Sequence, residues 1–347
     1  MASQTKSRSN NTSRIFSSRS LLLPGLLVGI ALLIICLLWS ITLGAADITP
    51  QVVYNALLHF DSSNFQHLII QTVRLPRVLS GVTVGAALAV AGAVMQGLTR
   101  NPLADSGILG INGGASFAVV LTVFLLGNPP LSVYALFGFL GAAVAAGFVY
   151  FIAAMGRGGV TPLKLTLAGV ILTAFISSLT TSILLHDQQT LDKIRFWTSG
   201  SLAGRDMALF TQTFPYIAVG LICALLISRQ ITTINLGEDV AKGLGQNTLW
   251  VKAVSALIVV LLAGGSVALA GPIGFVGLIV PHVVRFMVGT DYRWVLPYSA
   301  VLGGLLVTVA DVGARLVVRP QELPVGVVMA IVGAPFFIWL ARWKVKR

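Results

Sequence analysis

The sequence has little charge, and its long apolar stretches contain none. Only 10% of its 347 residues are Asp, Glu, Lys or Arg, whereas 56% are hydrophobic. Between Ser20 and Ala341 the charged residues gather in short clusters. The runs between these clusters are roughly 20 residues long, which is the helix length needed to cross a hydrocarbon core about 30 Å thick. The chain is therefore predicted to be an all-α integral membrane protein with no separate soluble domain.

The apolar runs also lack an ionisable group at membrane depth. Transporters that couple to protons or sodium usually keep one there, although it costs about 3 kcal/mol or more. The sequence has no GxxxxGK[ST] phosphate-binding loop either, so nucleotide hydrolysis is not assigned to this chain. The energy for any transport is therefore predicted to come from a partner, and an ion-driven secondary transporter is the less favoured alternative.

Metal and enzyme signatures are missing as well. The two cysteines, Cys36 and Cys223, lie inside apolar runs, and the four histidines are scattered, so neither a metal site nor any other cofactor is predicted. The sequence shows neither paired carboxylates nor a Ser-His arrangement with convincing spacing, so an intramembrane enzyme is not predicted. The net charge of +12 does not indicate nucleic acid, because the basic residues lie at membrane boundaries, as the positive-inside rule expects.

The N-terminal region is expected to be a disordered cytoplasmic arm at residues 1–19, because it is basic and rich in Ser and Asn. The apolar run Leu21–Leu43 follows it. This run is longer than the roughly 7 to 15 residues of a signal-peptide core. A retained helix is therefore favoured over a signal that is cleaved near Gly44-Ala45-Ala46.

Counting the apolar runs gives nine or ten crossings, depending on whether 253–284 is one helix or two. Both basic termini are expected in the cytoplasm, which requires an even number of crossings. The stretch is therefore predicted to form two helices, broken at Gly271-Pro272. This topology places 16 of the 23 basic residues on the cytoplasmic side. The ten predicted crossings are 20–46, 78–99, 106–126, 131–156, 165–186, 207–228, two within 249–284, 294–310 and 323–341.

Small residues recur at helical spacing within the second crossing. Gly81 and Gly85 form a GxxxG pair, and Ala89, Gly92 and Ala93 extend the same stripe. Such stripes let helix backbones approach closely in membranes. We assign this stripe to packing within the chain rather than to a function.

Four longer motifs carry a family resemblance. They are Arg74-Leu75-Pro76-Arg77 followed by Gly92–Gly97 and Asn101–Asp105, then Gly271–His282, then Ala310–Arg315, and finally Glu322–Gly326 with Gly333-Ala334-Pro335. In this order they resemble the FecCD family of ABC-transporter permeases. The resemblance implies a type II ABC importer permease fold of ten helices within residues 20–347, in the cytoplasmic (inner) membrane, with both termini cytoplasmic.

The same resemblance implies partners and a cargo. A dimer of cytoplasmic ATP-binding cassette ATPases, an extracytoplasmic substrate-binding protein and a second permease, identical or related, are expected around this chain. The family imports iron chelates, haem or cobalamin. The aromatic and Gly-Ser-containing segment Arg195–Gly204, expected to form a half helix at the outer mouth, favours a ferric siderophore. An interfacial anchor explains Trp197 almost equally well.

Three arginines are the candidate docking residues for the binding protein. Arg74 and Arg77 are spaced i, i+3 at the predicted outer start of the second crossing, so they project from one face. The resemblance implies that such arginines meet acidic residues of the binding protein, and Arg315 occupies the corresponding position after the ninth crossing. The alternative is that these long side chains reach toward lipid headgroups.

The longest predicted cytoplasmic loop, 229–252, contains the candidate ATPase-coupling segment. Its acidic start suits a helix N-terminus, Gly243 or Gly245 can end the helix, and Val240, Ala241 and Leu244 form its less polar side. It resembles the coupling helix of the family, and a merely solvated linker is the alternative. The residues assigned to coupling are Gly237, Glu238, Asp239, Ala241, Gly243, Leu244 and Gly245.

Two further assignments are made. The cytoplasmic turn at Thr161, Pro162 and Leu163, which enters the fifth crossing, is the candidate inner gate. Asp105 and Asp311 flank predicted helices, which fits helix caps or boundary hydrogen bonds better than a proton relay.

Overall fold

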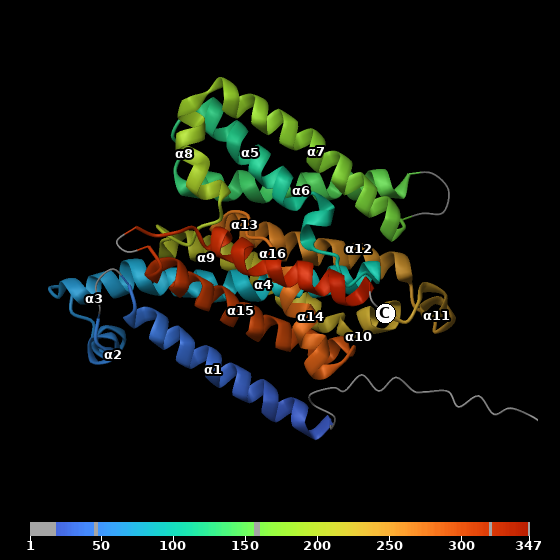
Figure 1. The fold of residues 1–347 in the computed structure, drawn as a ribbon, viewed down its shortest axis with the longest axis horizontal. Helices are drawn as coiled ribbons and strands as arrows, with labels where there is room; N and C mark the ends of the chain where they lie inside the picture. Colours follow the sequence, from blue (N-terminus) through green and yellow to red (C-terminus); the bar gives the residue numbers. More distant parts are fainter. Residues whose placement is uncertain (1–18, 45–47, 156–159, 319–320, 346–347) are drawn as a thin grey trace, which may run out of the picture.

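The computed structural model describes residues 19–44, 48–155, 160–318 and 321–345, and every regular element in these ranges is a helix (Figure 1). The predicted all-α class is therefore confirmed for the described residues. Of the predicted N-terminal arm, only Arg19 falls within them.

Within the described ranges, seven helices are long and apolar enough to cross a membrane, and three shorter apolar helices accompany them. The seven are α1 (Leu22–Thr42), the continuous Phe65–Thr99, α6 (Leu131–Ala154), α7 (Pro162–His186), α9 (Met207–Leu226), the continuous Thr248–Ala270 and α15 (Tyr292–Leu316). The shorter ones are α5 (Ile111–Leu126), α14 (Val276–Val288) and the Val325–Trp339 part of α16 (Val325–Val345). This composition identifies a multi-pass membrane protein.

Two of the long helices contain a π-helical turn. Ile70–Arg74 joins α3 (Phe65–Ile69) to α4 (Leu75–Thr99), and Val260–Gly264 joins α12 (Thr248–Val259) to α13 (Gly265–Ala270). The predicted start of the second crossing near Arg74 is therefore wrong. The helix continues through this point, where Arg74 and Arg77 are buried rather than solvated at a membrane boundary.

The predicted break at Gly271-Pro272 is present. α13 ends at Ala270, and Gly271 adopts a left-handed backbone with φ of 74°. A side chain at Gly271 would come within 2.2 Å of the Trp197 carbonyl oxygen, so the position needs glycine for both conformation and space. α14 then begins at Val276.

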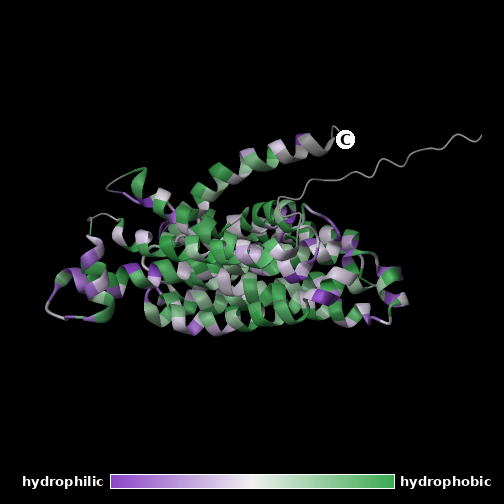
Figure 2. Ribbon diagram, turned by 90° about the horizontal axis from the view of Figure 1, so that it is seen from below, coloured by the Kyte–Doolittle hydropathy of each residue, from purple (hydrophilic) through white to green (hydrophobic). Residues whose placement is uncertain are grey.

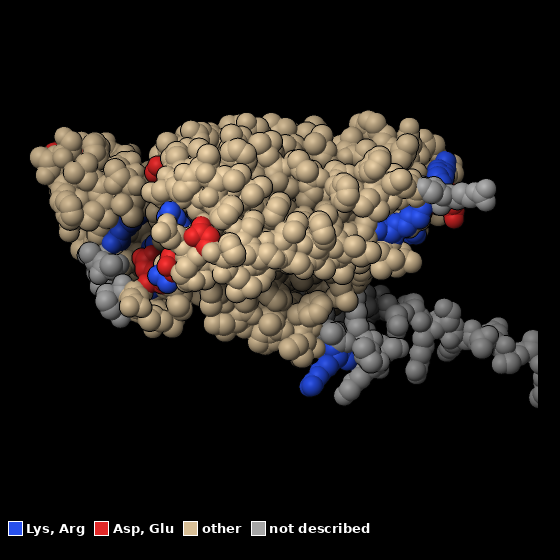
Figure 3. Space-filling view, turned by 90° about the horizontal axis from the view of Figure 1, so that it is seen from above, with Lys and Arg blue, Asp and Glu red and all other residues tan. Residues whose placement is uncertain are grey.

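Polar elements lie at the two ends of the long axis of the molecule. One end carries α2 (Pro50–Leu58), α3 and α8 (Gln188–Thr198), and we call it the α3 end. The opposite end, the α11 end, carries α10 (Ser228–Asn235) and α11 (Glu238–Gly243). The helices between these ends are predominantly apolar (Figure 2). The charged side chains visible in Figure 3 likewise gather toward the ends, as a chain spanning a membrane requires.

α4 is the centre of the bundle. Of the most apolar 18-residue window of Phe65–Thr99, 83% is buried, against 17% for α7 and 6% for α1. α4 packs against α15, α14, α12 and α9, and α1 lies on the outer side of α15. α5, α6, α7 and α8 form a separate group along one side of this core (Figure 1).

The small-residue stripe of α4 makes the predicted close contacts within the chain. A Cβ atom at Gly85 would lie 2.2 Å from the Gly303 carbonyl oxygen of α15. At Gly92 it would lie 2.1 Å from the Gly277 carbonyl oxygen of α14. The backbones of α4, α14 and α15 therefore touch at glycines, and the assignment of this stripe to packing is confirmed.

Candidate functional site

The segment at the α11 end forms the short helix predicted for 229–252. α11 covers Glu238–Gly243, with both acidic residues in its first turn, where the helix dipole favours negative charge. Of the two glycines predicted to end it, Gly245 has the left-handed backbone, with φ of 78°, and Gly243 lies inside the helix. Gly237 precedes the helix with φ of 134°.

The predicted apolar side of α11 is divided in the structure. Ala241 is fully buried and packs with Ile234 and Val251 inside the chain. Val240 and Leu244 are 49% and 70% exposed. Of the predicted apolar side, Val240 and Leu244 are therefore available to a partner, whereas Ala241 holds α11 against α10 and α12.

An ion pair ties α11 to the neighbouring transmembrane helix. The Glu238 carboxylate accepts a hydrogen bond from Lys252 of α12 at 2.8 Å, and Lys242 lies 3.3 Å away. The hydrogen bond from Lys252, with a smaller contribution from Lys242, lowers the pKa of the Glu238 carboxyl. Because the folded-state pKa is depressed, this link stabilises the fold at neutral pH and is lost only as the pH falls through the lowered value.

The same lysine reaches the candidate inner gate. Lys252 Nζ also donates to the Val160 carbonyl oxygen at 3.2 Å. The next residue, Thr161, caps α7 by accepting a hydrogen bond from the Lys164 amide at 3.3 Å. Pro162 is the first residue of α7, and Leu163 is 69% exposed. Glu238, Lys252 and the start of α7 thus form one continuous chain of polar contacts.

The three candidate docking arginines meet at the α3 end, where all are buried. Arg74, Arg77 and Arg315 are 6%, 7% and 5% exposed. Arg74 Nη1 donates to the Thr42 carbonyl at 2.8 Å and also to the Ile41 carbonyl, and Arg315 Nη1 donates to the Leu43 carbonyl at 2.7 Å. These bonds satisfy carbonyl groups at the end of α1, which have no partner within that helix.

Asp311 is the centre of this arrangement. Its carboxylate accepts from Arg77 Nη2 at 2.9 Å and Nε at 3.1 Å, and it lies 3.1 Å from Arg315 Nη2. Arg77 Nη1 donates to Glu322 at 2.7 Å. We call Arg77, Asp311, Arg315 and Glu322 the arginine cluster. Asp311 lies inside α15 and is only 2% exposed, so of its two predicted roles it is not a helix cap, but it does accept hydrogen bonds near the end of the helix.

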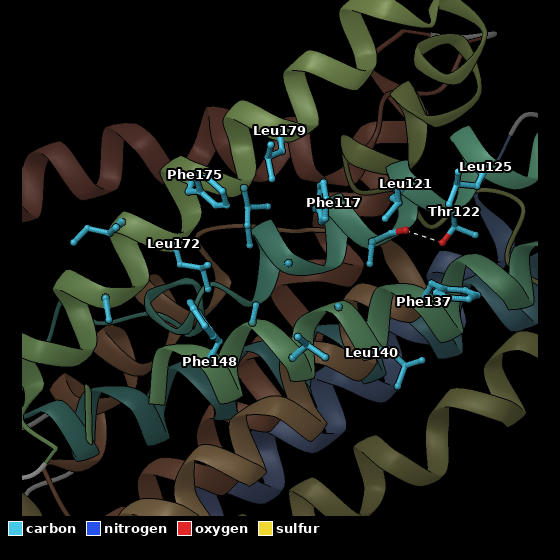
Figure 4. Close-up of a pocket in the computed structure, with 18 of the residues that line it drawn as sticks. Phe117, Leu121, Thr122, Leu125, Phe137, Leu140, Phe148, Leu172, Phe175 and Leu179 are labelled. Carbon is cyan, nitrogen blue, oxygen red and sulfur yellow. Dashed lines mark hydrogen bonds between the residues drawn. The ribbon is translucent and has the colours of Figure 1, made fainter. Parts of the chain in front are cut away.

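An apolar groove of about 870 Å³ lies between α5, α6 and α7 (Figure 4). Phe117, Leu140 and Phe175 are among its lining residues, and its one hydroxyl group, Thr122, donates to the Ala118 carbonyl of its own helix at 2.7 Å. In a bilayer such a groove suits acyl chains or an apolar helix. It offers no polar group that could orient a metal chelate.

The opposite face of α7 carries hydroxyl groups. Thr166, Thr173, Ser177 and Thr180 are spaced 7, 4 and 3 residues apart, so they share one side of the helix. None of these four is buried. The groove residues Leu172, Phe175 and Leu179 project from the other side. Ser178 and Ser182 share the side of Phe175 and Leu179, so α7 carries hydroxyl groups on both sides.

The segment Arg195–Gly204 does not form the predicted half helix. Arg195–Thr198 is the last turn of α8, and the chain from Ser199 onward is a loop. The loop is held in place because the Ser201 amide donates to the Ala270 carbonyl at 2.8 Å and the Gly326 amide donates to the Gly200 carbonyl at 3.0 Å. These contacts join distant parts of the chain, and the local sequence does not reveal them.

Comparison with known proteins gives consistent matches along the chain. The FecCD transport family matches residues 32–343. The siderophore transport system permease protein YfiZ of Bacillus subtilis is 49% identical over 309 residues, which cover 88% of this chain and 92% of YfiZ. The iron(3+)-hydroxamate import system permease protein FhuB of the same organism is 45% identical over 317 residues, which cover 91% of this chain and 82% of FhuB.

One solved structure shows the same architecture. It is an inward-facing conformation of a metal-chelate type ABC transporter, with a TM-score of 0.81 and 28% sequence identity. The match covers 94% of this chain and 99% of that chain.

Proposed function

The chain belongs to the FecCD transport family, and from this premise we propose that it is the permease subunit of an ABC importer that carries ferric siderophores across the cytoplasmic membrane. The observation that carries the proposal is the 49% identity to a siderophore permease over 88% of the chain. Haem and cobalamin remain the alternative cargoes within the same transporter class.

The proposed topology has ten crossings, with the α11 end and both termini in the cytoplasm. Residues 20–347 would form one permease domain after the cytoplasmic arm at 1–19. The seven long and three shorter apolar helices support this count. The α3 end then faces outward. An even number of crossings also agrees with a basic sequence at each terminus.

The proposed partners act at opposite ends. A dimer of cytoplasmic ATPases would bind the α11 end, where Val240 and Leu244 expose apolar side chains. The binding protein would dock at the α3 end around Arg74, Arg77 and Arg315. A second permease, identical or related, would complete the path, with the hydroxyl face of α7 as part of its lining. Ser, Thr and apolar groups bind cargo loosely, which favours release.

The cargo assignment is tested by uptake in proteoliposomes that contain the permease, its ATPase and its binding protein. ATP-dependent uptake is expected for a ferric hydroxamate siderophore and not for haem or cobalamin. Uptake of cobalamin alone would keep the importer class and refute the siderophore assignment.

Within this mechanism, Lys252 transmits motion from α11 to the inner gate at Thr161, Pro162 and Leu163. Replacing Lys252 with methionine keeps its aliphatic length but removes both hydrogen bonds to Glu238 and Val160. We expect uptake to fall about tenfold, because Lys242 still pairs with Glu238 but the hydrogen-bonded link from α11 to the start of α7 is lost. ATP hydrolysis by the assembled transporter should continue.

The matched control is Lys242→Gln. Lys242 pairs with the same glutamate, but its side chain is 59% exposed, so the loss should be small. Equal uptake by the Lys252→Met and Lys242→Gln variants would show that the hydrogen bond from Lys252 to Val160 does not couple α11 to the inner gate.

A further inference from the structure

A second polar site lies at the α3 end, beside the arginine cluster, with which it shares Glu322. It is a pocket of about 350 Å³ between the start of α6, α8, the loop before α9 and the loop before α16. Its walls include three aromatic residues and three charged ones. These are Tyr134, Phe196 and Trp197, and Lys193, Arg205 and Glu322.

Arg205 is buried in this pocket without an ion-pair partner. It is 7% exposed, and its Nε donates to the Ser201 carbonyl at 3.2 Å. Across the described part of the chain, no carboxylate oxygen lies within 4 Å of its guanidinium. Burial lowers the pKa of Arg205 to about 10, which the charge of Asp206 opposes only partly. Its two terminal nitrogens, free of hydrogen bonds to described residues, can take a new acceptor.

The charges around Arg205 differ from those of the arginine cluster. Arg77 and Arg315 are already compensated by Asp311 and Glu322. Glu322 reaches the pocket wall, but its carboxylate is held by Arg77 at 2.7 Å. Lys193 also lines the pocket, and among the described residues its ammonium donates to the Gly127 carbonyl at 3.2 Å and interacts electrostatically with Asp187. The pocket therefore has an excess of positive charge that its own residues leave uncompensated.

The backbone that presents Arg205 is fixed before any partner arrives. The Ser201 carbonyl that holds Arg205 belongs to the loop bound to Ala270 and Gly326. A cation that is positioned in advance loses little conformational entropy on binding, so its contact contributes more of its energy to affinity.

We propose that this pocket receives a carboxylate side chain of the extracytoplasmic binding protein, with Arg205 as its main contact and Lys193 as the second. The proposal rests on the proposed function, which places the α3 end outward. A guanidinium pairs with a carboxylate through two parallel hydrogen bonds, and the half-enclosed site strengthens that contact. A volume near 350 Å³ is at the small end of ligand pockets, so it suits a side chain better than a whole ferric siderophore.

The test compares Arg205→Gln with Arg195→Gln. Arg195 lies on α8 at the same end of the molecule, but its side chain is 61% exposed and pairs with Asp192. The affinity of the purified permease for its binding protein is measured at several salt concentrations. Arg205→Gln should weaken binding about tenfold or more and reduce its salt dependence, because a buried charge pair is lost. Arg205→Lys should lose less, and Arg195→Gln should bind like the unaltered chain.

Lys193→Gln keeps the test valid if Arg205→Gln fails to fold, because Lys193 is exposed and its replacement leaves the core intact. A clear loss of affinity in Lys193→Gln supports the pocket. Unchanged affinity in both the Lys193 and the Arg205 variants would overturn it.

Two other outcomes separate the possible errors. Citrate serves as a small carboxylate probe. Suppose that citrate binds the unaltered chain but not Arg205→Gln, whereas the binding protein binds both chains equally. The pocket would then be a site for free carboxylates, and the docking assignment would be wrong. If the unaltered permease binds no binding protein at all, the proposed function fails, and this pocket proposal fails with it.

Discussion

Tryptophan in place of Gly243 is expected to abolish uptake while the permease remains folded in the membrane. A Cβ atom at Gly243 would meet nothing within 4 Å, so a large side chain there projects from α11 without disturbing the fold. It would stand beside the exposed Val240 and Leu244, on the surface that we propose enters the ATPase. Steric exclusion should therefore prevent assembly, which co-purification of the ATPase with the permease measures directly.

Gly243→Ala is the matched control. Alanine also finds open space and favours a helix over glycine by about 1 kcal/mol, so it should assemble and transport normally. Normal ATPase binding and uptake by Gly243→Trp would mean that α11 is the solvated linker and that coupling occurs elsewhere. Ala241→Trp would not decide the question, because Ala241 is fully buried and its replacement would disturb packing.

The second large effect is expected at Asp311. Asparagine there would leave Arg77 and Arg315 buried with Glu322 as the remaining carboxylate of the arginine cluster. Removing one member of a buried ion pair typically costs about 3 to 5 kcal/mol. We therefore expect Asp311→Asn to lower the thermal unfolding temperature of the purified permease strongly and to reduce its level in the membrane.

Asp192→Asn provides the comparison, since the Asp192–Arg195 pair lies at the same end but is exposed on both sides. Exposed pairs contribute little to stability, so this variant should unfold like the unaltered chain. If Asp311→Asn were equally stable, the arginine cluster would not hold α4 and α15 together, and a purely external docking role for its arginines would gain support.

The positions of the membrane helices could be predicted from the sequence because lipid imposes a simple rule. A run without charge and of sufficient length must be helical to satisfy its own backbone. The break at Gly271-Pro272 and the glycine contacts of α4 also follow from local chemistry. The short helices α2, α8 and α10 were not predicted, because helices too short to cross a membrane carry no such signal.

The candidate site was predicted less completely. The sequence identified α11 as a helix, but it could not show that Ala241 faces inward, because helix orientation is decided by the packing of α10 and α12. Arg77 and Asp311 are 234 residues apart, so their contact was not predictable from spacing. A charged residue beside an apolar run predicts the boundary of the membrane. Arg77 and Asp311 instead compensate each other's charge inside the fold.

The role of Lys252 and the pocket at Arg205 were also missed, for the same reason. In the sequence, Lys252 is only a basic residue at the end of the predicted loop 229–252. Its contacts with Glu238 and Val160 span 14 and 92 residues. Arg205 differs from the compensated arginines in being buried without an ion-pair partner among the described residues, and burial depends on the three-dimensional fold.

The source of energy is the most direct test of the whole account, because the ionisable groups inside α4 and α15, namely Arg77, Asp311 and Arg315, compensate one another. The measurement is accumulation of a ferric siderophore in proteoliposomes, first with the permease alone under a proton or sodium gradient, and then with its ATPase, its binding protein and ATP. The account predicts accumulation only in the second case. Accumulation by the permease alone, driven by either gradient, would contradict it.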